Sequence, residues 1–123
     1  MKMQPDRLEG ANQISRLEGS RLWVHQARFE GSVLVPHRGS VLAWEAQCFE
    51  DLSADHFGAV LALKPELVIL GTGARLRFPA PALWRALMEA RVGFEAMDTS
   101  AACRTFNVLA SEGRAVLAAL ILA

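Results

Sequence analysis

The feature that most constrains the fold is a short apolar run, Leu67–Leu70, followed directly by a glycine turn, Gly71–Gly73. Consecutive apolar residues with β-branched members in the middle are typical of a strand buried on both faces. Such strands occur mainly in parallel sheets that are covered by helices. Pro65 ends the element that precedes the run. We therefore expect a central parallel strand over residues 67–70, with a loop at its carboxyl end.

Helical patterns lie on both sides of this strand. Ser53 is a suitable N-cap for a helix over residues 54–63, where apolar side chains recur at helical spacing. Downstream, helical patterns over residues 81–91 and 101–112 enclose a short β pattern over residues 94–97. Strands and helices that alternate in this way predict a parallel sheet with crossover helices.

The two ends of the pattern are less regular. Between residues 21 and 35, apolar and polar residues alternate in short pieces, and the turn-forming residues 36–39 precede another extended run at 41–44. These pieces predict antiparallel strands in a hairpin or short meander. The final apolar run, residues 115–122, fits a helix or a strand on periodicity alone, and its alanines and leucines favour a helix.

Chain length and composition indicate one domain. The chain has 123 residues, 52% of them hydrophobic, which suffices for one well-buried core. Residues 1–18 mix charged and small polar residues without a clear period, so we expect a flexible leader, or at most one loosely held element. Residues 19–123 then form a single α/β domain.

The charge balance and the cysteine count exclude several classes of function. Thirteen basic residues balance thirteen acidic ones, so no net field attracts nucleic acid. Two cysteines without a CxxC pair, and three scattered histidines, predict neither a disulfide framework nor a metal site, and no cofactor motif is complete. The sequence shows no signal peptide and no run of about 18 apolar residues, so we expect a cytoplasmic protein without membrane insertion.

The predicted strands place two loops at one edge of the sheet. The glycine turn follows residues 67–70, and Asp98 follows residues 94–97. Ligands of open α/β sheets bind at the carboxyl ends of parallel strands, where glycines expose backbone amides. The turn lacks both the complete GxGxxG signature and the GK[ST] ending of a P-loop, so a structural turn is the favoured interpretation. The candidate ligand-binding residues are Gly71, Thr72, Gly73, Asp98, Thr99, Arg104 and Asn107.

The helix after residue 100 carries further candidates, each with a structural alternative. Cys103 lies in the first helical turn beside Arg104, which would favour a reactive thiolate, yet no histidine is near it and buried inert cysteines are common. Arg104 and Asn107 either face the crevice or belong to a network that fastens the helix to the sheet, and the second interpretation is favoured. We predict no catalytic residue.

Four motifs in the second half of the chain, taken together, resemble those of the Mth-domain family. They are GTG at residues 71–73, EAMDT at 95–99, ACRTFNVL at 102–109 and EGR at 112–114. The resemblance implies a three-layer α/β fold with a central mixed, mostly parallel sheet, crossover helices and an N-terminal β-hairpin layer. It also implies that the last run is a strand. Phe106 departs from the tyrosine usual in the family, which removes a hydroxyl.

The resemblance also bears on function. It implies no established enzymatic activity, and family members with an assigned role act in the assembly of mitochondrial complex I through protein contacts. Our leading hypothesis is therefore a non-enzymatic protein-interaction or assembly module. The alternative is a small-ligand or anion-binding protein, with or without catalysis, that uses the crevice between the glycine turn and residues 98–99. The sequence does not indicate an oligomeric state.

Overall fold

The computed structural model of the chain describes residues 10–122. Its first unit is a three-stranded antiparallel sheet in the order β1–β2–β3. These strands span Ile14–Glu18, Arg21–Val24 and Ala27–Glu30. Tight connections join neighbouring strands, which gives the N-terminal β layer that the resemblance implies.

The second unit is a five-stranded mixed sheet in the order β5–β4–β8–β6–β7. Strands β8, β6 and β7 run parallel, whereas β4 pairs antiparallel with both β5 and β8. The strands span Val33–Pro36 (β4), Leu42–Ala43 (β5), Leu67–Gly71 (β6), Gly93–Met97 (β7) and Val116–Leu120 (β8). The predicted mixed sheet is confirmed, with its parallel part formed by the strands of the second half.

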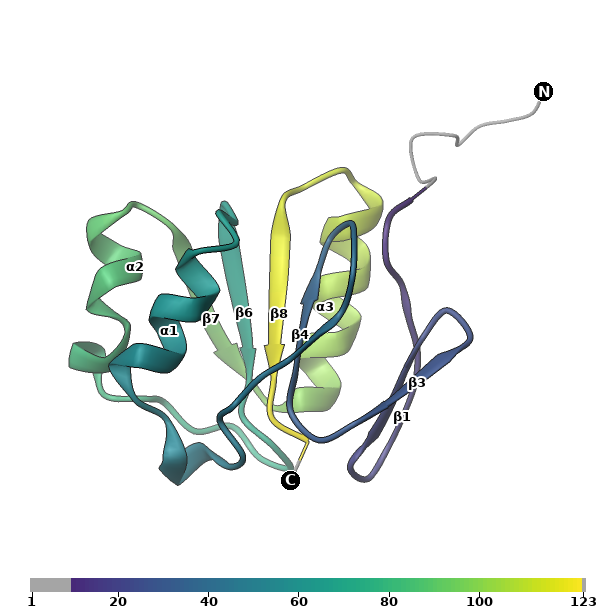
Figure 1. The fold of residues 1–123 in the computed structure, drawn as a ribbon, viewed down its shortest axis with the longest axis horizontal. Coiled ribbons are helices and arrows are strands. Elements are labelled where there is room, and N and C mark those ends of the chain that lie inside the picture. The colour runs from purple at the N-terminus through teal and green to yellow at the C-terminus, as the bar shows by residue number, and fades with distance from the viewer. Residues whose placement is uncertain (1–9, 123) are drawn as a thin grey trace.

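The helices cover this sheet on both faces (Figure 1). Helices α1 and α2 lie on one face, and α3 lies on the other face together with the three-stranded sheet. The helical elements span Phe49–Asp51 (η2), Ala54–Leu61 (α1), Pro81–Trp84 (η3), Arg85–Glu89 (α2) and Thr99–Ser111 (α3). The chain passes from β6 to the edge strand β7, and then from β7 back past β6 to β8. Two crossovers of the same hand that run in opposite directions along a sheet place their helices on opposite faces, which is why α2 and α3 lie on opposite faces. The predicted three-layer α/β fold is confirmed.

The final run is the strand β8, in the middle of the sheet, and not the helix that its alanines favour. All five of its residues are buried. Ala118 packs in the core beneath α3, and Ala119 packs in the core beneath α1 and α2. The small Ala118 side chain fits beneath α3, and the central place of β8 buries both of its faces, so tertiary packing overrides the intrinsic helix propensity.

Regular structure begins earlier than the expected leader boundary at residue 18. Strand β1 starts at Ile14, which is buried, and it pairs with β2 along its length. A register irregularity between Ile14 and Arg16 interrupts the alternation of this strand, which is why the sequence shows no clear period there. The first nine residues of the predicted leader lie outside the described residues.

Candidate functional site

The glycine turn is bonded tightly to the start of α3. The Thr72 N–H donates to the Met97 carbonyl at 2.8 Å, and the Gly73 N–H donates to the Thr99 hydroxyl oxygen at 2.8 Å. In return the Thr99 N–H donates to the Gly73 carbonyl at 2.9 Å. The two loops do meet at one edge of the sheet, but the amides of Thr72 and Gly73 are occupied by protein acceptors.

The Thr99 hydroxyl joins the ends of three strands. It accepts the bond from Gly73, which follows β6, and donates to the Ile121 carbonyl after β8 at 2.7 Å. Thr99 itself follows β7 and is buried. Gly71 makes room for this contact, because a Cβ atom there would lie 2.9 Å from the Thr99 hydroxyl oxygen. The glycine at this position therefore permits a close approach between the strand and the helix.

Thr72 has a structural role of the same kind. Its side chain is buried, and its hydroxyl contacts the carbonyls of Arg75 at 2.6 Å and Met97 at 3.0 Å. The Arg77 N–H donates to the same oxygen at 3.2 Å. One hydroxyl thus holds the loop after β6 in shape, and it is turned into the protein.

A pocket of about 330 Å³ lies beside this turn. Asp98 is on its wall, although its carboxylate already accepts the Ala101 N–H at 2.9 Å as the N-cap of α3. Of the predicted ligand-binding residues, Gly73, Asp98 and Thr99 line the pocket, whereas Gly71 and Thr72 do not. The pocket is lined by Leu17, Gly19, Gly73, Ala74, Asp98, Thr99, Ser100, Ile121 and Leu122.

Arg104 and Asn107 do not join this pocket. The Arg104 guanidinium donates to the Ser100 hydroxyl at 2.9 Å, one turn earlier on the exposed side of α3. The Asn107 side chain bonds both backbone groups of Ile14, accepting from its N–H and donating to its carbonyl at 2.8 Å each. Asn107 therefore fastens α3 to β1, which agrees with the structural interpretation of this residue.

The Cys103 thiol is buried in the core beneath α3. Burial raises the pKa of this thiol from its ordinary 9.0 to about 11, although the nearby Arg104 acts in the opposite direction. At neutral pH the sulfur is therefore protonated and is not a nucleophile. The inert interpretation of Cys103 is the one that its environment supports.

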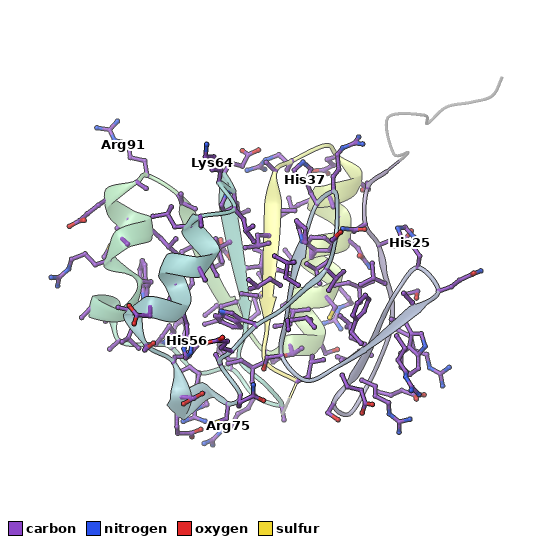
Figure 2. All side chains as sticks on the ribbon, viewed as in Figure 1. His25, His37, His56, Lys64, Arg75 and Arg91 are labelled. Carbon is purple, nitrogen blue, oxygen red and sulfur yellow. The ribbon has the colours of Figure 1, made fainter. Side chains whose placement is uncertain are left out.

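The titratable side chains of the described residues do not gather into a metal centre. Residues 10–122 contain no group of three or more His, Cys, Asp or Glu side chains placed to hold a metal ion. Figure 2 shows His25, His37 and His56 on separate parts of the molecule. His56 has a local structural contact, since its Nδ1 accepts the Ser53 N–H at 3.2 Å at the start of α1.

A second concave surface, which the sequence analysis did not identify, lies beside β7. Phe78 is 75% exposed there, an unusual environment for a phenylalanine. Nearby, the rings of Trp84 and Phe94 stack with their centroids 4.5 Å apart. This concave surface encloses a volume of about 600 Å³, and we call it the Phe78 groove. It is lined by Phe78, Pro79, Ala80, Pro81, Trp84, Phe94, Glu95 and Ala96. Its one sequence signal is an aromatic residue directly before a Pro-Ala-Pro segment, which precedes the helical pattern expected over residues 81–91.

The sequence and the fold can be compared with those of known proteins. A family described as "Protein of unknown function (DUF498/DUF598)" matches residues 14–121. The chain belongs to this family. A crystallised Bordetella parapertussis protein is 35% identical, with a TM-score of 0.87 over 93% of this chain and 98% of that one.

A Bordetella pertussis protein described as a Mth938-like domain is 29% identical, with a TM-score of 0.84 over 99% of this chain and 92% of that one. The resemblance to the Mth-domain family is thereby confirmed. Among curated proteins, "NADH dehydrogenase [ubiquinone] 1 alpha subcomplex assembly factor 3" of Bos taurus is 38% identical over 67% of this chain. The match covers 46% of the bovine protein, so the chain spans about half the length of that relative.

The comparisons also touch on location. Within residues 10–122, no helix is both long and apolar enough to cross a membrane. A Francisella tularensis relative, 28% identical over 58% of each chain, is named "13 kDa major membrane protein". The cytoplasmic localisation expected from the sequence stays a prediction.

Proposed function

We propose that this chain is a non-enzymatic protein-interaction module that binds a partner through the Phe78 groove, in the manner of an assembly factor. The observation that carries the proposal is the 75% exposure of Phe78 in a groove floored by stacked aromatic rings. Exposed apolar patches mark interaction sites, and aromatic residues, phenylalanine included, are enriched at protein interfaces. The likeness to complex I assembly factor 3 supports the same kind of role.

The local structure holds the groove open. The Trp84 indole N–H donates to the Pro79 carbonyl at 3.4 Å, which ties the two ends of the groove wall together. The Arg77 guanidinium pairs with Glu50 at 2.6 Å and lies 4.2 Å from the centre of the Phe49 ring. These contacts hold the chain on both sides of Phe78, which favours a groove that a partner need not order.

Site-specific crosslinking in native lysate tests the proposal. Phe78 is replaced by the photo-crosslinking residue p-benzoylphenylalanine, and illumination is expected to yield one reproducible protein adduct, identified by mass spectrometry. Val108 provides the control position, because it is 56% exposed on α3 and does not line the groove. Adducts of equal yield at both positions, or none at Phe78, would contradict the proposal.

The small-ligand alternative retains one observation in its favour. Gly73, Asp98 and Thr99 line a single pocket of about 330 Å³, as an anion or ligand site at this sheet edge requires. The bonds within the turn weigh against it, because the amides of Thr72 and Gly73 already have acceptors. The interaction module is therefore the better supported of the two functions.

A further inference from the structure

Strand β7 ends the five-stranded sheet, and one of its sides has no neighbouring strand among the described residues. Its other side pairs with β6. The Gly93 N–H donates toward β6, to the Glu66 carbonyl at 3.0 Å, and the Met97 carbonyl accepts the Thr72 N–H at 2.8 Å. The backbone N–H and C=O groups of Gly93 and Met97 therefore point toward β6 and away from the open side of β7.

Alternation along the strand then determines which residues face outward. Successive residues of a strand direct their backbone groups to opposite sides. Gly93, Glu95 and Met97 accordingly direct theirs toward β6, whereas Phe94 and Ala96 direct N–H and C=O groups toward the open edge. This edge carries the hydrogen-bonding groups that an added strand requires.

The open edge and the Phe78 groove are parts of one surface. Phe94 and Ala96 line the groove together with Phe78 and Trp84. The side chains of Phe94 and Ala96 pack on the α1 and α2 face of the sheet. A strand added to β7 would place the residues opposite Phe94 and Ala96 on this same face, against the aromatic floor.

Glu95 decides between two possible occupants of this edge. It lies at the centre of β7, is exposed, and forms no ion pair or side-chain hydrogen bond within residues 10–122. If two copies paired antiparallel through β7 in the register centred on Glu95, which pairs the whole strand, their Glu95 side chains would face each other at a non-hydrogen-bonded position, where cross-strand side chains lie closest. This repulsion disfavours a second copy and favours a partner with a cation at that position.

We infer that an extended segment of a partner protein adds to β7 as an antiparallel strand. A lysine or arginine of the segment lies opposite Glu95, and an apolar residue on each side of it enters the Phe78 groove. This inference rests on the proposed function, and it names the chemistry of the partner. Backbone pairing gives the affinity, while the apolar–basic–apolar pattern gives the selectivity.

A peptide titration tests the backbone pairing. The probe is acetyl-Ser-Val-Lys-Leu-Ser-amide, added to the isotope-labelled full chain and followed by amide chemical shifts. We expect the largest changes at Phe94, Ala96 and Phe78. N-methylation of the valine or leucine nitrogen should abolish binding, because those residues bond the open edge. N-methylation of the lysine nitrogen should leave binding unchanged, because that group points away.

A charge exchange tests the role of Glu95. The Glu95→Lys variant should bind the lysine peptide roughly threefold to tenfold more weakly, and a peptide with glutamate in place of lysine should restore the affinity. Equal affinity of both peptides for both proteins, or shift changes away from β7, would overturn the inference. A dimer whose Phe94 and Ala96 amides resist exchange without peptide would overturn it in favour of a second copy.

The two proposals fail in distinguishable ways. If crosslinking at Phe78 succeeds but the peptides leave Phe94 and Ala96 unchanged, the partner binds the groove without adding a strand, and only the inference fails. If crosslinking at Phe78 gives no adduct, the proposed function fails whatever the peptides do.

Discussion

Gly71 is a position at which the surrounding core leaves almost no room for a side chain. An added Cβ would lie 2.9 Å from the Leu120 side chain and 3.1 Å from the Thr99 Cα atom. We predict that Gly71→Ala lowers the free energy of unfolding by about 1–3 kcal/mol, as overpacking does in cores. Chemical denaturation measures the change.

Gly58 provides the matched control for this substitution. It lies in α1, is exposed, and has no atom within 4 Å of an added Cβ. Gly58→Ala should therefore raise the stability by about 0.5–1 kcal/mol, because alanine loses less conformational freedom in a helix. Equal effects of the two substitutions would refute the close approach at Gly71.

Cys103 gives the fold a dependence on alkaline pH. Its pKa is raised by burial from 9.0 to about 11, so the folded state holds the thiol proton more tightly than the unfolded state. The resulting stabilisation is complete below pH 9 and is lost as the pH rises from 9 to 11. At roughly 1.4 kcal/mol per pKa unit, the loss is on the order of 3 kcal/mol.

Denaturation of the wild type and of Cys103→Ala at pH 8 and pH 10.5 isolates this contribution. The stability advantage of the wild type should shrink at the higher pH. An advantage that is the same at both pH values, or rapid thiol labelling of folded Cys48→Ser protein at pH 8, would show that Cys103 is not held in the buried, protonated state.

At the scale of elements, α3 and β1 are joined by hydrogen bonds from a single α3 side chain, in addition to core packing. Asn107 makes two hydrogen bonds to the Ile14 backbone. We predict that Asn107→Ala costs about 1–3 kcal/mol, because it leaves an N–H and a carbonyl without partners. Amide exchange should accelerate in β1 and stay slow in β6.

Ser111→Ala serves as the control for this prediction. The Ser111 hydroxyl donates only to the Val108 carbonyl of its own helix, at 2.7 Å. Its removal should leave β1 exchange unchanged. If Asn107→Ala and Ser111→Ala behave alike, β1 is held by packing alone and Asn107 has no special role.

The elements also show what the sequence can and cannot predict. Strand β6 and its turn follow from local pattern, because a buried strand and a glycine turn each have a distinctive composition. Strand β8 does not, since its alanines favour a helix and only its central place makes it a strand. The start of β1 stayed hidden because the irregularity between Ile14 and Arg16 breaks the alternation.

At the scale of the whole molecule, the sequence predicts where the candidate ligand site lies but not which groups are exposed or free to bind. Strand order alone predicts that the turn and Asp98 share an edge, which the pocket confirms. The sequence could not show that Thr72 and Thr99 turn their hydroxyls inward, nor that Phe78 stays exposed while Pro79 beside it is buried. Exposure and hydrogen bonding depend on contacts between distant segments, so a linear pattern does not reveal them.

The pocket beside the turn gives a prediction about the molecule as a whole. Because the amides of Gly73 and Thr99 on its wall are bonded to protein acceptors, we expect no thermal stabilisation by phosphate, nucleotides or small carboxylates. A ligand at 100 times its dissociation constant would stabilise the fold by about 2.7 kcal/mol, which a melting experiment detects readily. A clear shift that Asp98→Asn or Ser100→Ala alters would revive the small-ligand function.

The affinity of the crosslinked partner for purified variants tests the interaction module most directly. Calorimetry compares the wild type with Phe78→Asp and with Val108→Asp, which places the same charge at an exposed apolar site outside the groove. We predict that Phe78→Asp weakens binding by about thirtyfold or more, as expected for an interface anchor, and that Val108→Asp changes it little. Equal affinities for all three proteins would contradict a partner site at the Phe78 groove.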